Sequence, residues 1–433
     1  MLYVYIPDRT PRHEYIVHLL LEELLGIPVE YVTEPAELQA KEGPKLVYAR
    51  AYQGPAFFLK AVPLLWEKDI RPQAIETVAW EGAVPGIFPV DGGRWAFDPL
   101  AASFWLVSRY EEYLPFVPDA HGRFPAEASW MVQQQLQLHP LVNHWVRRLL
   151  TDLRTHFGTE LGKMPTYTFR TTLDIDNAFA FQHKGFYRAG VGTLAAMGRR
   201  DFRMLGARFN VALQKTHDPY DTHQKLRRLH EKYHTKPFVF WLLGDYGPFD
   251  KNLSHKNPAL QSLIRQSALH ADLGIHPSYA SLSKAALIVK EKKRLEQIVH
   301  QPIIRSRQHY LRMQLPRTYR DLLAAGIRGD YTMGWATTSG FRAGLAAPFL
   351  FYDLAKEETT KLRVFPFAFM DATLLKMKLT PDAAVAHVGE IVDAVKQTGG
   401  WLSGIFHNES PGGWGEWEGW GDVYEAILQK AVS

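Results

Sequence analysis

The sequence contains no cysteine among its 433 residues. This absence excludes disulfides, zinc–thiolate sites and thiol nucleophiles, so any bound metal must use nitrogen and oxygen ligands. Long apolar runs are also missing. The most apolar early segment, Tyr15 to Leu25, is interrupted by Glu22 and Glu23 and is shorter than the roughly 20 residues that span a bilayer. The sequence therefore predicts no membrane span.

The chain also lacks a strong excess of charge. Its net charge is +5, and Lys and Arg are scattered along the sequence, which argues against a nucleic-acid partner. Residues 1–8 lack the basic, apolar and small-residue zones of a secretory signal, so we expect a cytoplasmic protein.

What the chain has is material for packed domains. Hydrophobic residues make up 46% of it, enough for two or three domains with well-formed cores. Aromatic residues make up 13%, which favours a sugar or another ring-bearing ligand, although aromatic side chains serve cores more often than ligands.

The first part of the chain reads as an α/β unit. Strands are predicted at Leu2 to Ile6, Pro28 to Thr33 and Lys45 to Tyr48, with a helix between the first two that stops at Gly26. The charged segment Ser108 to Tyr113 is expected to form a solvated or locally paired face. A polar stretch at 158–164 suggests a boundary, so we divide the chain into residues 1–162, an N-terminal α/β domain of unknown role, and residues 163–433.

The second part alternates short apolar runs with helical segments, which predicts a parallel sheet. The number of runs suggests a distorted seven-stranded (β/α) barrel, in which catalytic groups sit at the carboxyl ends of the strands. The predicted strands are Thr166 to Asp174, Phe238 to Gly244, Ala271 to His276, Ile303 to Arg307, Ile327 to Thr332, Val364 to Met370 and Trp401 to His407.

Residues able to do chemistry end these runs. Asp174 and Asp176 close the first strand two residues apart, so both side chains point to the same side. His276 ends a later strand. Imidazole and carboxylate together suit zinc, iron, cobalt or nickel, and a second carboxylate kept off the metal can serve as a base. A cap or a local ion pair would be the purely structural explanation for the two acids.

Two later strand ends add further candidates. Arg307 is followed by His309 and Tyr310, and an Arg near an acidic pair would hold a base ionised and oriented. His407 follows the last strand, where an imidazole can protonate a leaving group. The next loop alternates Gly with Trp, beginning with Trp414, and could either stack on a sugar ring or close the barrel.

With these motifs, residues 166–428 resemble the polysaccharide deacetylase family (carbohydrate esterase family four, NodB-like), in the branch whose first motif reads Asp-x-Asp. The resemblance implies that Asp174 is the base, Asp176 and His276 bind a divalent metal, Arg307 positions the base and His407 is the general acid. It departs in one place, because the second His of the family's metal motif falls on Ala280. Ser278, His309 or a water could complete the ligand set.

The resemblance implies a hydrolase that removes an acetyl group from an N-acetylated sugar or glycan by metal-assisted water attack, with zinc as the expected metal and a carbohydrate as the substrate. His309, Tyr310 and Trp414 are the predicted substrate-binding residues. The alternative is a catalytically degenerate glycan-binding or scaffold protein, which the Ala280 departure favours.

Overall fold

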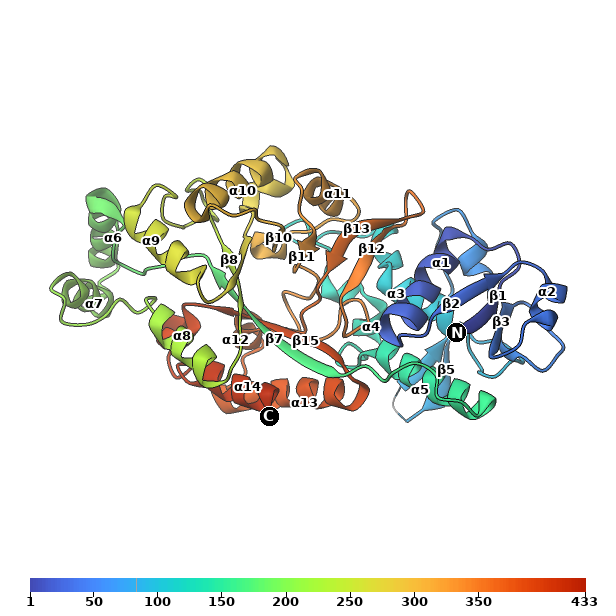
Figure 1. The fold of residues 1–433 in the computed structure, drawn as a ribbon. Coiled ribbons are helices and arrows are strands. Elements are labelled where there is room, and N and C mark those ends of the chain that lie inside the picture. The colour runs from blue at the N-terminus through green and yellow to red at the C-terminus, as the bar shows by residue number, and fades with distance from the viewer. Residues whose placement is uncertain (83) are drawn as a thin grey trace.

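A computed structural model describes residues 1–82 and 84–433 and contains two main sheets (Figure 1). The smaller sheet is built from residues near the N-terminus and the larger from residues after 166. Within the described residues, no helix is both long and apolar enough to cross a bilayer.

The N-terminal sheet is parallel throughout. Its four strands lie in the order β2-β1-β3-β4. The alternation of buried and exposed side chains in β1 and β4 is typical of strands with one face on a core. The elements of this region are β1 (Leu2–Tyr5), α1 (Pro11–Val17), β2 (Val29–Val32), α2 (Pro35–Ala40), β3 (Lys45–Ala49), β4 (Phe57–Lys60), β5 (Thr77–Glu81), β6 (Val84–Ile87), α3 (Pro99–Val107), α4 (Trp130–Gln133) and α5 (Leu141–Phe157).

The larger sheet has nine strands in the order β12-β13-β11-β10-β9-β8-β7-β15-β14, and only the β12–β13 pair is antiparallel. The short apolar runs become strands because flanking helices bury them, as in other parallel sheets. The strands are β7 (Tyr167–Ile175), β8 (Phe238–Trp241), β9 (Asp272–Ile275), β10 (Arg305–Ser306), β11 (Gly329–Asp330), β12 (Phe349–Asp353), β13 (Glu358–Val364), β14 (Phe369–Met370) and β15 (Gly400–His407).

This sheet differs from the predicted seven-stranded barrel. The β12–β13 hairpin was not predicted, and the predicted strand Val364 to Met370 is divided between the end of β13 and β14. The segment between β13 and β14 nevertheless forms hydrogen bonds to two strands of the sheet. Phe365 N–H donates to Asp330 O in β11, and Ala368 N–H donates to Ser403 O in β15. The strands at the two ends of the order, β12 and β14, are therefore connected in the chain through β13 and the segment that follows it.

The longest pairing in the sheet joins β7 to β15 over eight residues in parallel register, from Gly400 opposite Tyr167 to His407 opposite Asp174. Because parallel strands end at the same edge, Asp174 and His407 emerge side by side. The strand ends at His276 and Arg307 lie along the same edge, since β8, β9 and β10 continue the parallel order.

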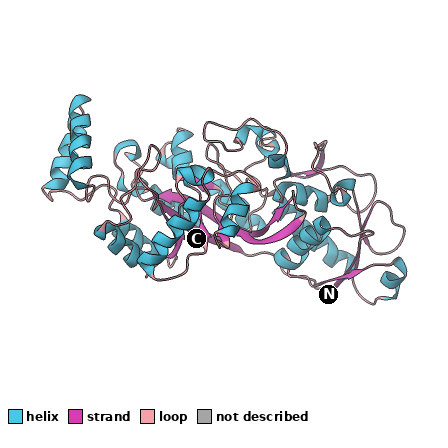
Figure 2. Ribbon diagram, turned by 90° about the horizontal axis from the view of Figure 1, so that it is seen from above, coloured by secondary structure: helices cyan, strands magenta, loops and turns pink. Residues whose placement is uncertain are grey.

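Helices cover the outside of this sheet, with α13 and α14 packed along β15 and β7 (Figure 1). Two others, α6 and α7, project away from the body at the end opposite the N-terminal sheet (Figure 2). The helices of this part are α6 (Gly185–Gly198), α7 (Phe202–Ala212), α8 (His223–Lys232), α9 (Pro258–Ser267), α10 (Ala286–Val299), α11 (Arg317–Ala324), α12 (Asp371–Lys376), α13 (Pro381–Thr398) and α14 (Val423–Val432).

The two parts of the chain share one apolar core, which includes side chains from Leu2 to Ala431. Charged residues are buried at their junction. Arg109 and Glu112 are locally paired, as one of the two expectations had it, but they are almost fully buried rather than solvated, and Glu112 also pairs with Arg342, 230 residues away. Residues 1–162 are thus packed tightly against the larger sheet.

Candidate functional site

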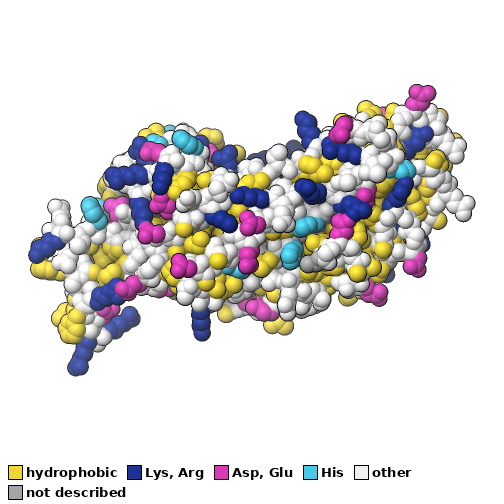
Figure 3. Space-filling model, turned by 90° about the horizontal axis from the view of Figure 1, so that it is seen from below, with side chains coloured by type: hydrophobic (Ala, Val, Ile, Leu, Met, Phe, Trp, Pro, Cys, Tyr) yellow, Lys and Arg dark blue, Asp and Glu magenta, His cyan; other side chains and the backbone are white. Residues whose placement is uncertain are grey.

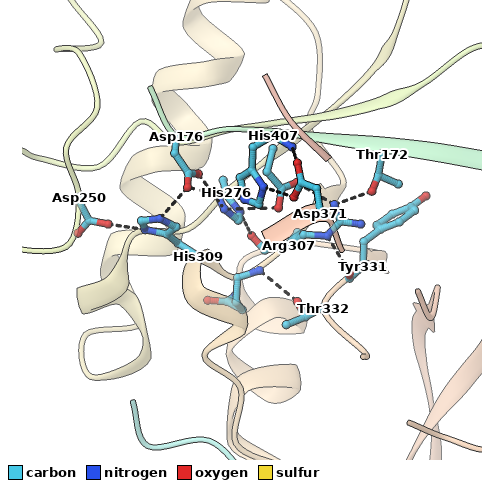
Figure 4. Close-up of polar contacts among 12 residues, drawn as sticks. Thr172, Asp176, Asp250, His276, Arg307, His309, Tyr331, Thr332, Asp371 and His407 are labelled. Carbon is cyan, nitrogen blue, oxygen red and sulfur yellow. Dashed lines mark hydrogen bonds and ion pairs between the residues drawn. The ribbon is translucent and has the colours of Figure 1, made fainter. Parts of the chain in front are cut away.

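The predicted site residues converge at the carboxyl edge of the larger sheet (Figure 4). Asp174 and Asp176 come from the end of β7 and the turn after it, and His276 follows β9. His309 lies just beyond β10, and His407 ends β15. All five line one cavity of about 320 Å³. The strand-end rule therefore brings together residues that are up to 233 positions apart in the sequence.

Asp174 is held by Arg307. The Arg307 Nη1 donates to Asp174 Oδ1 and to Thr172 Oγ1, both at 2.7 Å, while its Nε donates to Tyr331 O at 2.9 Å. Asp174 and Arg307 are both nearly inaccessible to solvent. Since Oδ1 is occupied by the guanidinium, Oδ2 is the oxygen free to act; it lies 3.7 Å from His276 Nε2. The predicted positioning of Asp174 by Arg307 agrees with this geometry.

Asp176, His276 and His309 form a cluster that could hold a metal ion. One ligand atom from each lies within 4.8 Å of the other two. His276 Nε2 is 3.3 Å from Asp176 Oδ1, and His309 Nε2 is 3.2 Å from Asp176 Oδ2. Ligands at 2.0–2.2 Å from a tetrahedral zinc are about 3.4 Å apart, so these spacings match a metal site. His309 was predicted to bind substrate, but the structure places it where the third ligand is needed.

The hydrogen bonds around the two imidazoles fit metal binding. His276 Nδ1 lies 2.6 Å from Arg307 O, and His309 Nδ1 lies 2.8 Å from Asp250 Oδ1. Both partners are acceptors, so each Nδ1 carries a proton, and each Nε2 is directed at Asp176, where it can hold either a proton or a metal ion. Asp176 Oδ1 is itself buried without a hydrogen-bond partner among the described residues. Lone pairs that face each other require a cation or a proton between them.

The pKa values of the cluster also favour a bound cation. Burial alone would raise the pKa of Asp176, but the neighbouring imidazoles, His309 first and then His276, hold this pKa well below its usual value. Burial opposes charge on His309, yet Asp176 and Asp250 raise the pKa of His309 to about 9. The negative potential that favours a proton here also favours a divalent cation, which would displace that proton.

His407 is paired with a buried carboxylate. Its Nδ1 lies 2.7 Å from Asp371 Oδ1, its backbone N–H donates to Asp371 Oδ2, and its Nε2 lies 4.0 Å from Asp176 Oδ2. Burial works against a charged imidazole, but Asp371, followed by Asp176 and Asp174, raises the pKa of His407 to about 10. His407 is therefore held in its proton-donating form.

The walls of the cavity include aromatic side chains. Tyr310 and Trp417 line it, whereas Trp414, the predicted substrate-binding residue, does not. Gly413 and Gly415 both have positive φ, and the chain turns around Trp414. Its indole instead lies 5.1 Å from the Arg203 guanidinium, outside the cavity. The assignment of Trp414 is thus corrected, and Trp417 takes its place at the wall.

Sequence reasoning missed three residues at the site. Asp250 lies in the loop after β8 and Arg123 lies before α4, and neither follows a predicted strand. Arg123 lines the cavity, where its Nη1 donates to Tyr310 O at 2.7 Å. Asp371 does end a predicted strand, but no partner was assigned to it. Its position at a strand end was the one available signal.

Comparisons with known proteins gave one family model and several solved structures. A family model for a family of unknown function (DUF7033) matches residues 2–158. No curated protein gives a significant match.

Solved structures match over a larger share of this chain. They include the polysaccharide deacetylase Bc1974 from Bacillus cereus, at 12% identity and a TM-score of 0.30, covering 61% of this chain and 86% of that one. A family 4 carbohydrate esterase from Streptomyces lividans has 10% identity and a TM-score of 0.30, with coverages of 62% and 88%. A pseudoenzyme of the same family from Bacillus anthracis has 8% identity and a TM-score of 0.28, with 62% of each chain covered. Similarities this weak establish no activity.

Proposed function

We propose that this chain is a metal-dependent carbohydrate deacetylase, which removes an acetyl group from an N-acetylated sugar or glycan. One observation supports it above the others: three metal-ligating side chains, an Arg-anchored carboxylate and a carboxylate-paired imidazole share a single cavity. Metal-assisted hydrolysis of an amide uses a metal site, a base and a proton donor, which these three parts can supply.

Asp176, His276 and His309 would hold the metal, with zinc as the proposed ion because the ligands are two imidazoles and one carboxylate. When bound, the ion would polarise the acetyl carbonyl and lower the pKa of a water. The buried partners Arg307 O and Asp250 fix the rotation of the two imidazoles, which keeps their lone pairs aimed at one point.

Asp174 would act as the base. Arg307 holds its Oδ1 and fixes the orientation of the carboxylate, so Oδ2 remains available to take a proton from the attacking water. Arg307 is itself oriented by Thr172 and Tyr331 O, and its charge is therefore fixed in place.

His407 would protonate the departing amine. Its pairing with Asp371 keeps it protonated at neutral pH, and its Nε2 points toward Asp176 on the cavity side. Asp174 and His407 are opposed in the β7–β15 register, so a proton acceptor and a proton donor flank the same space.

The walls of the cavity suit a sugar. Phe249, Tyr310 and Trp417 line it together with polar side chains, and aromatic rings stack on the apolar faces of pyranose rings. The chain segment that bonds to both β11 and β15 supports a distorted barrel as the framework of this site. We assign residues 163–433 to the barrel and residues 1–162 to an N-terminal domain packed against it.

Metal analysis combined with acetate release from N-acetylated oligosaccharides tests the proposal. The parent protein should bind close to one divalent ion and release acetate. His309→Ala should lose both, whereas His270→Ala, a change at an exposed imidazole far from the cavity, should lose neither. A parent protein that binds no metal under any loading condition and releases no acetate would exclude this function.

A second candidate is a glycan-binding protein without turnover. It is favoured by Ala280, because the expected second imidazole of the metal motif is absent from its usual spacing. Binding of oligosaccharide that persists in Asp174→Asn, with no acetate formed by the parent, would support it. Acetate release that depends on Asp174 would exclude it.

A further inference from the structure

Helices α6 and α7 form a hairpin that stands apart from the body of the molecule (Figures 1 and 2). The basic hairpin, residues 184–215, is inserted between β7 and β8 in addition to α8, whereas β8 and β9 are joined through α9 and β9 and β10 through α10. Neither of its helices is needed to complete the sheet. We therefore expect the projecting hairpin to have a role other than support of the sheet.

The basic hairpin exposes large apolar side chains. Seven of the sixteen large hydrophobic residues that are exposed in the described chain lie on it: Phe186, Val191, Leu194, Met197, Phe202, Phe209 and Leu213. Val191, Leu194 and Met197 are spaced by three along α6, while Phe202, Phe209 and Leu213 are spaced by seven and four, so each set shares one helix face. Isolated exposed residues are ordinary, but a concentration of this kind marks an interaction surface.

The charge of the basic hairpin is equally uneven. It contains seven Lys and Arg residues and a single acid, Asp201, giving it a net charge of +6, whereas the whole chain carries only +5. Arg199 and Arg200 are exposed in the turn between the two helices, flanked by Met197 and Phe202. At this end of the molecule, Lys and Arg side chains lie beside hydrophobic ones (Figure 3).

The base of the basic hairpin is attached to the loops around the cavity. Arg188 donates to Lys251 O and Asn252 O, in the loop that contributes Phe249 and Lys251 to the cavity wall. On α7, Arg203 pairs with Glu418 at 2.9 Å, next to the loop that contributes Trp417. Whatever the tip binds is thereby kept at a fixed side of the cavity mouth.

We propose that the basic hairpin docks on the surface of a membrane that contains anionic lipids. Exposed Phe, Leu and Met side chains would enter the boundary between headgroups and acyl chains, while Arg199 and Arg200 would pair with lipid phosphates. A second copy of the chain fits less well, because two hairpins of net charge +6 would repel each other. A nucleic acid would match the charge but leave the aliphatic side chains uncovered.

Flotation with lipid vesicles tests the proposal on the full-length protein. We expect co-flotation with vesicles that contain phosphatidylglycerol and not with vesicles of phosphatidylcholine alone. Binding should fall at an ionic strength of about 1 M, where the Debye length is about 3 Å. The double charge reversal Arg199→Glu with Arg200→Glu should weaken partitioning by about tenfold or more, and Phe202→Ser should weaken it by about tenfold.

A matched pair of controls lies at the end of α9 and just after it. Leu269 has the same 76% exposure as Phe202, and Arg265 is an exposed cation one turn earlier. Leu269→Ser and Arg265→Glu should leave vesicle binding unchanged. Circular dichroism of the hairpin variants should match that of the parent, since the tip residues contribute little to the core.

Three results would overturn the proposal. The first is the absence of flotation with anionic vesicles at low salt. The second is equal binding to neutral and anionic vesicles, which would leave the arginines without a role. The third is a dimer that Phe202→Ser dissociates in the absence of lipid, which would make a second copy the occupant of this surface. None of these depends on deacetylase activity.

Discussion

Two buried clusters of charge in this molecule are built in opposite ways. At the junction of the two sheets, Glu112 accepts from Arg109 Nε at 2.7 Å and from Arg342 at 2.8 and 2.7 Å, so both of its oxygens are satisfied. At the carboxyl edge of the larger sheet, Asp176 Oδ1 and Arg307 Nη2 are buried without hydrogen-bond partners among the described residues. A complete cluster supports packing, whereas an incomplete one has room for a ligand.

The pKa values express the same contrast. Burial raises the pKa of Glu112, but Arg342 and Arg109 more than offset it and leave the value lowered. Around Asp176 the compensating groups are imidazoles, which can exchange their protons for a metal. Buried charge alone is therefore a poor marker of function, and the unpaired atoms are the better one.

The largest expected effect is on catalysis. Asp174→Asn should lower acetate release by about 10²- to 10⁴-fold, because it removes the proposed base while keeping the shape of the side chain. The metal content should stay the same, since Asp174 is outside the ligand cluster. The measurement is kcat under saturating substrate, together with metal analysis of the same sample. Unchanged kcat would remove Asp174 from the mechanism.

The next effect is on stability, at the junction. Glu112→Ala leaves two guanidiniums buried without their carboxylate, and we expect a loss of about 3–5 kcal/mol in the free energy of unfolding. Urea denaturation followed by tryptophan fluorescence measures it. The matched control is Glu231→Ala, which breaks the exposed pair of Glu231 with Arg227 and should change the urea midpoint little. Similar losses for the two variants would mean that the buried cluster is no more important than a surface pair.

Glu291 is a third buried carboxylate, intermediate between the fully hydrogen-bonded Glu112 and the incompletely bonded Asp176. Glu291 accepts from Ser278 N and Oγ, but its burial raises its pKa to about 7. An acid whose pKa is higher in the folded protein binds more protons there, so folding is favoured at low pH and this contribution is lost as the pH rises through 7. We expect up to about 3 kcal/mol of this loss between pH 5 and 8.

The pH dependence belongs to Glu291 only if substitution removes it. Glu291→Gln, which keeps the shape but cannot ionise, should have a flatter stability curve than the parent over this pH range. Parallel curves for the two proteins would assign the dependence to other groups.

The smallest effect concerns the partner of a proposed metal ligand. Asp250→Asn should lower metal affinity about 10- to 100-fold, because the amide no longer fixes the His309 imidazole as a carboxylate does. Competition with a chelator at constant pH measures the affinity. Asp245→Asn, a change at an exposed carboxylate in the same loop, is the control. Equal affinities for the two variants would mean that Asp250 has no role in metal binding.

Much of the site could be predicted because strand ends are local features. Asp174, His276 and His407 each close an apolar run, and parallel pairing then brings them together. His309 was one of three candidates for the missing ligand, because the family spacing places the second His of the metal motif on Ala280, four residues after His276. The structure supplies the third metal-ligating side chain, which is the second imidazole of the cluster, from the end of a different strand, and sequence spacing alone cannot choose among such candidates.

The features that could not be predicted depend on contacts across long sequence distances. Arg109 and Glu112 lie in a segment whose charged sequence is typical of an exposed surface. Arg342, which is distant in the sequence, adds the hydrogen bonds that satisfy both oxygens of the buried Glu112 carboxylate. The β12–β13 hairpin interrupts the strand–helix alternation that suggested a seven-stranded barrel. Likewise, the charge of the basic hairpin is diluted in the average over the whole chain.

The pairing of β7 with β15 has a consequence far from the chemistry. At its first residue, Gly400, a methyl group would fall 2.2 Å from Ala346 O, and φ is +135°. Any larger residue there would push the start of β15 away from its neighbour, and the strand would pass this displacement along about 25 Å of stiff backbone. We therefore expect inactivating substitutions at both ends of β15, including the Gly400 end, which is remote from the substrate cavity.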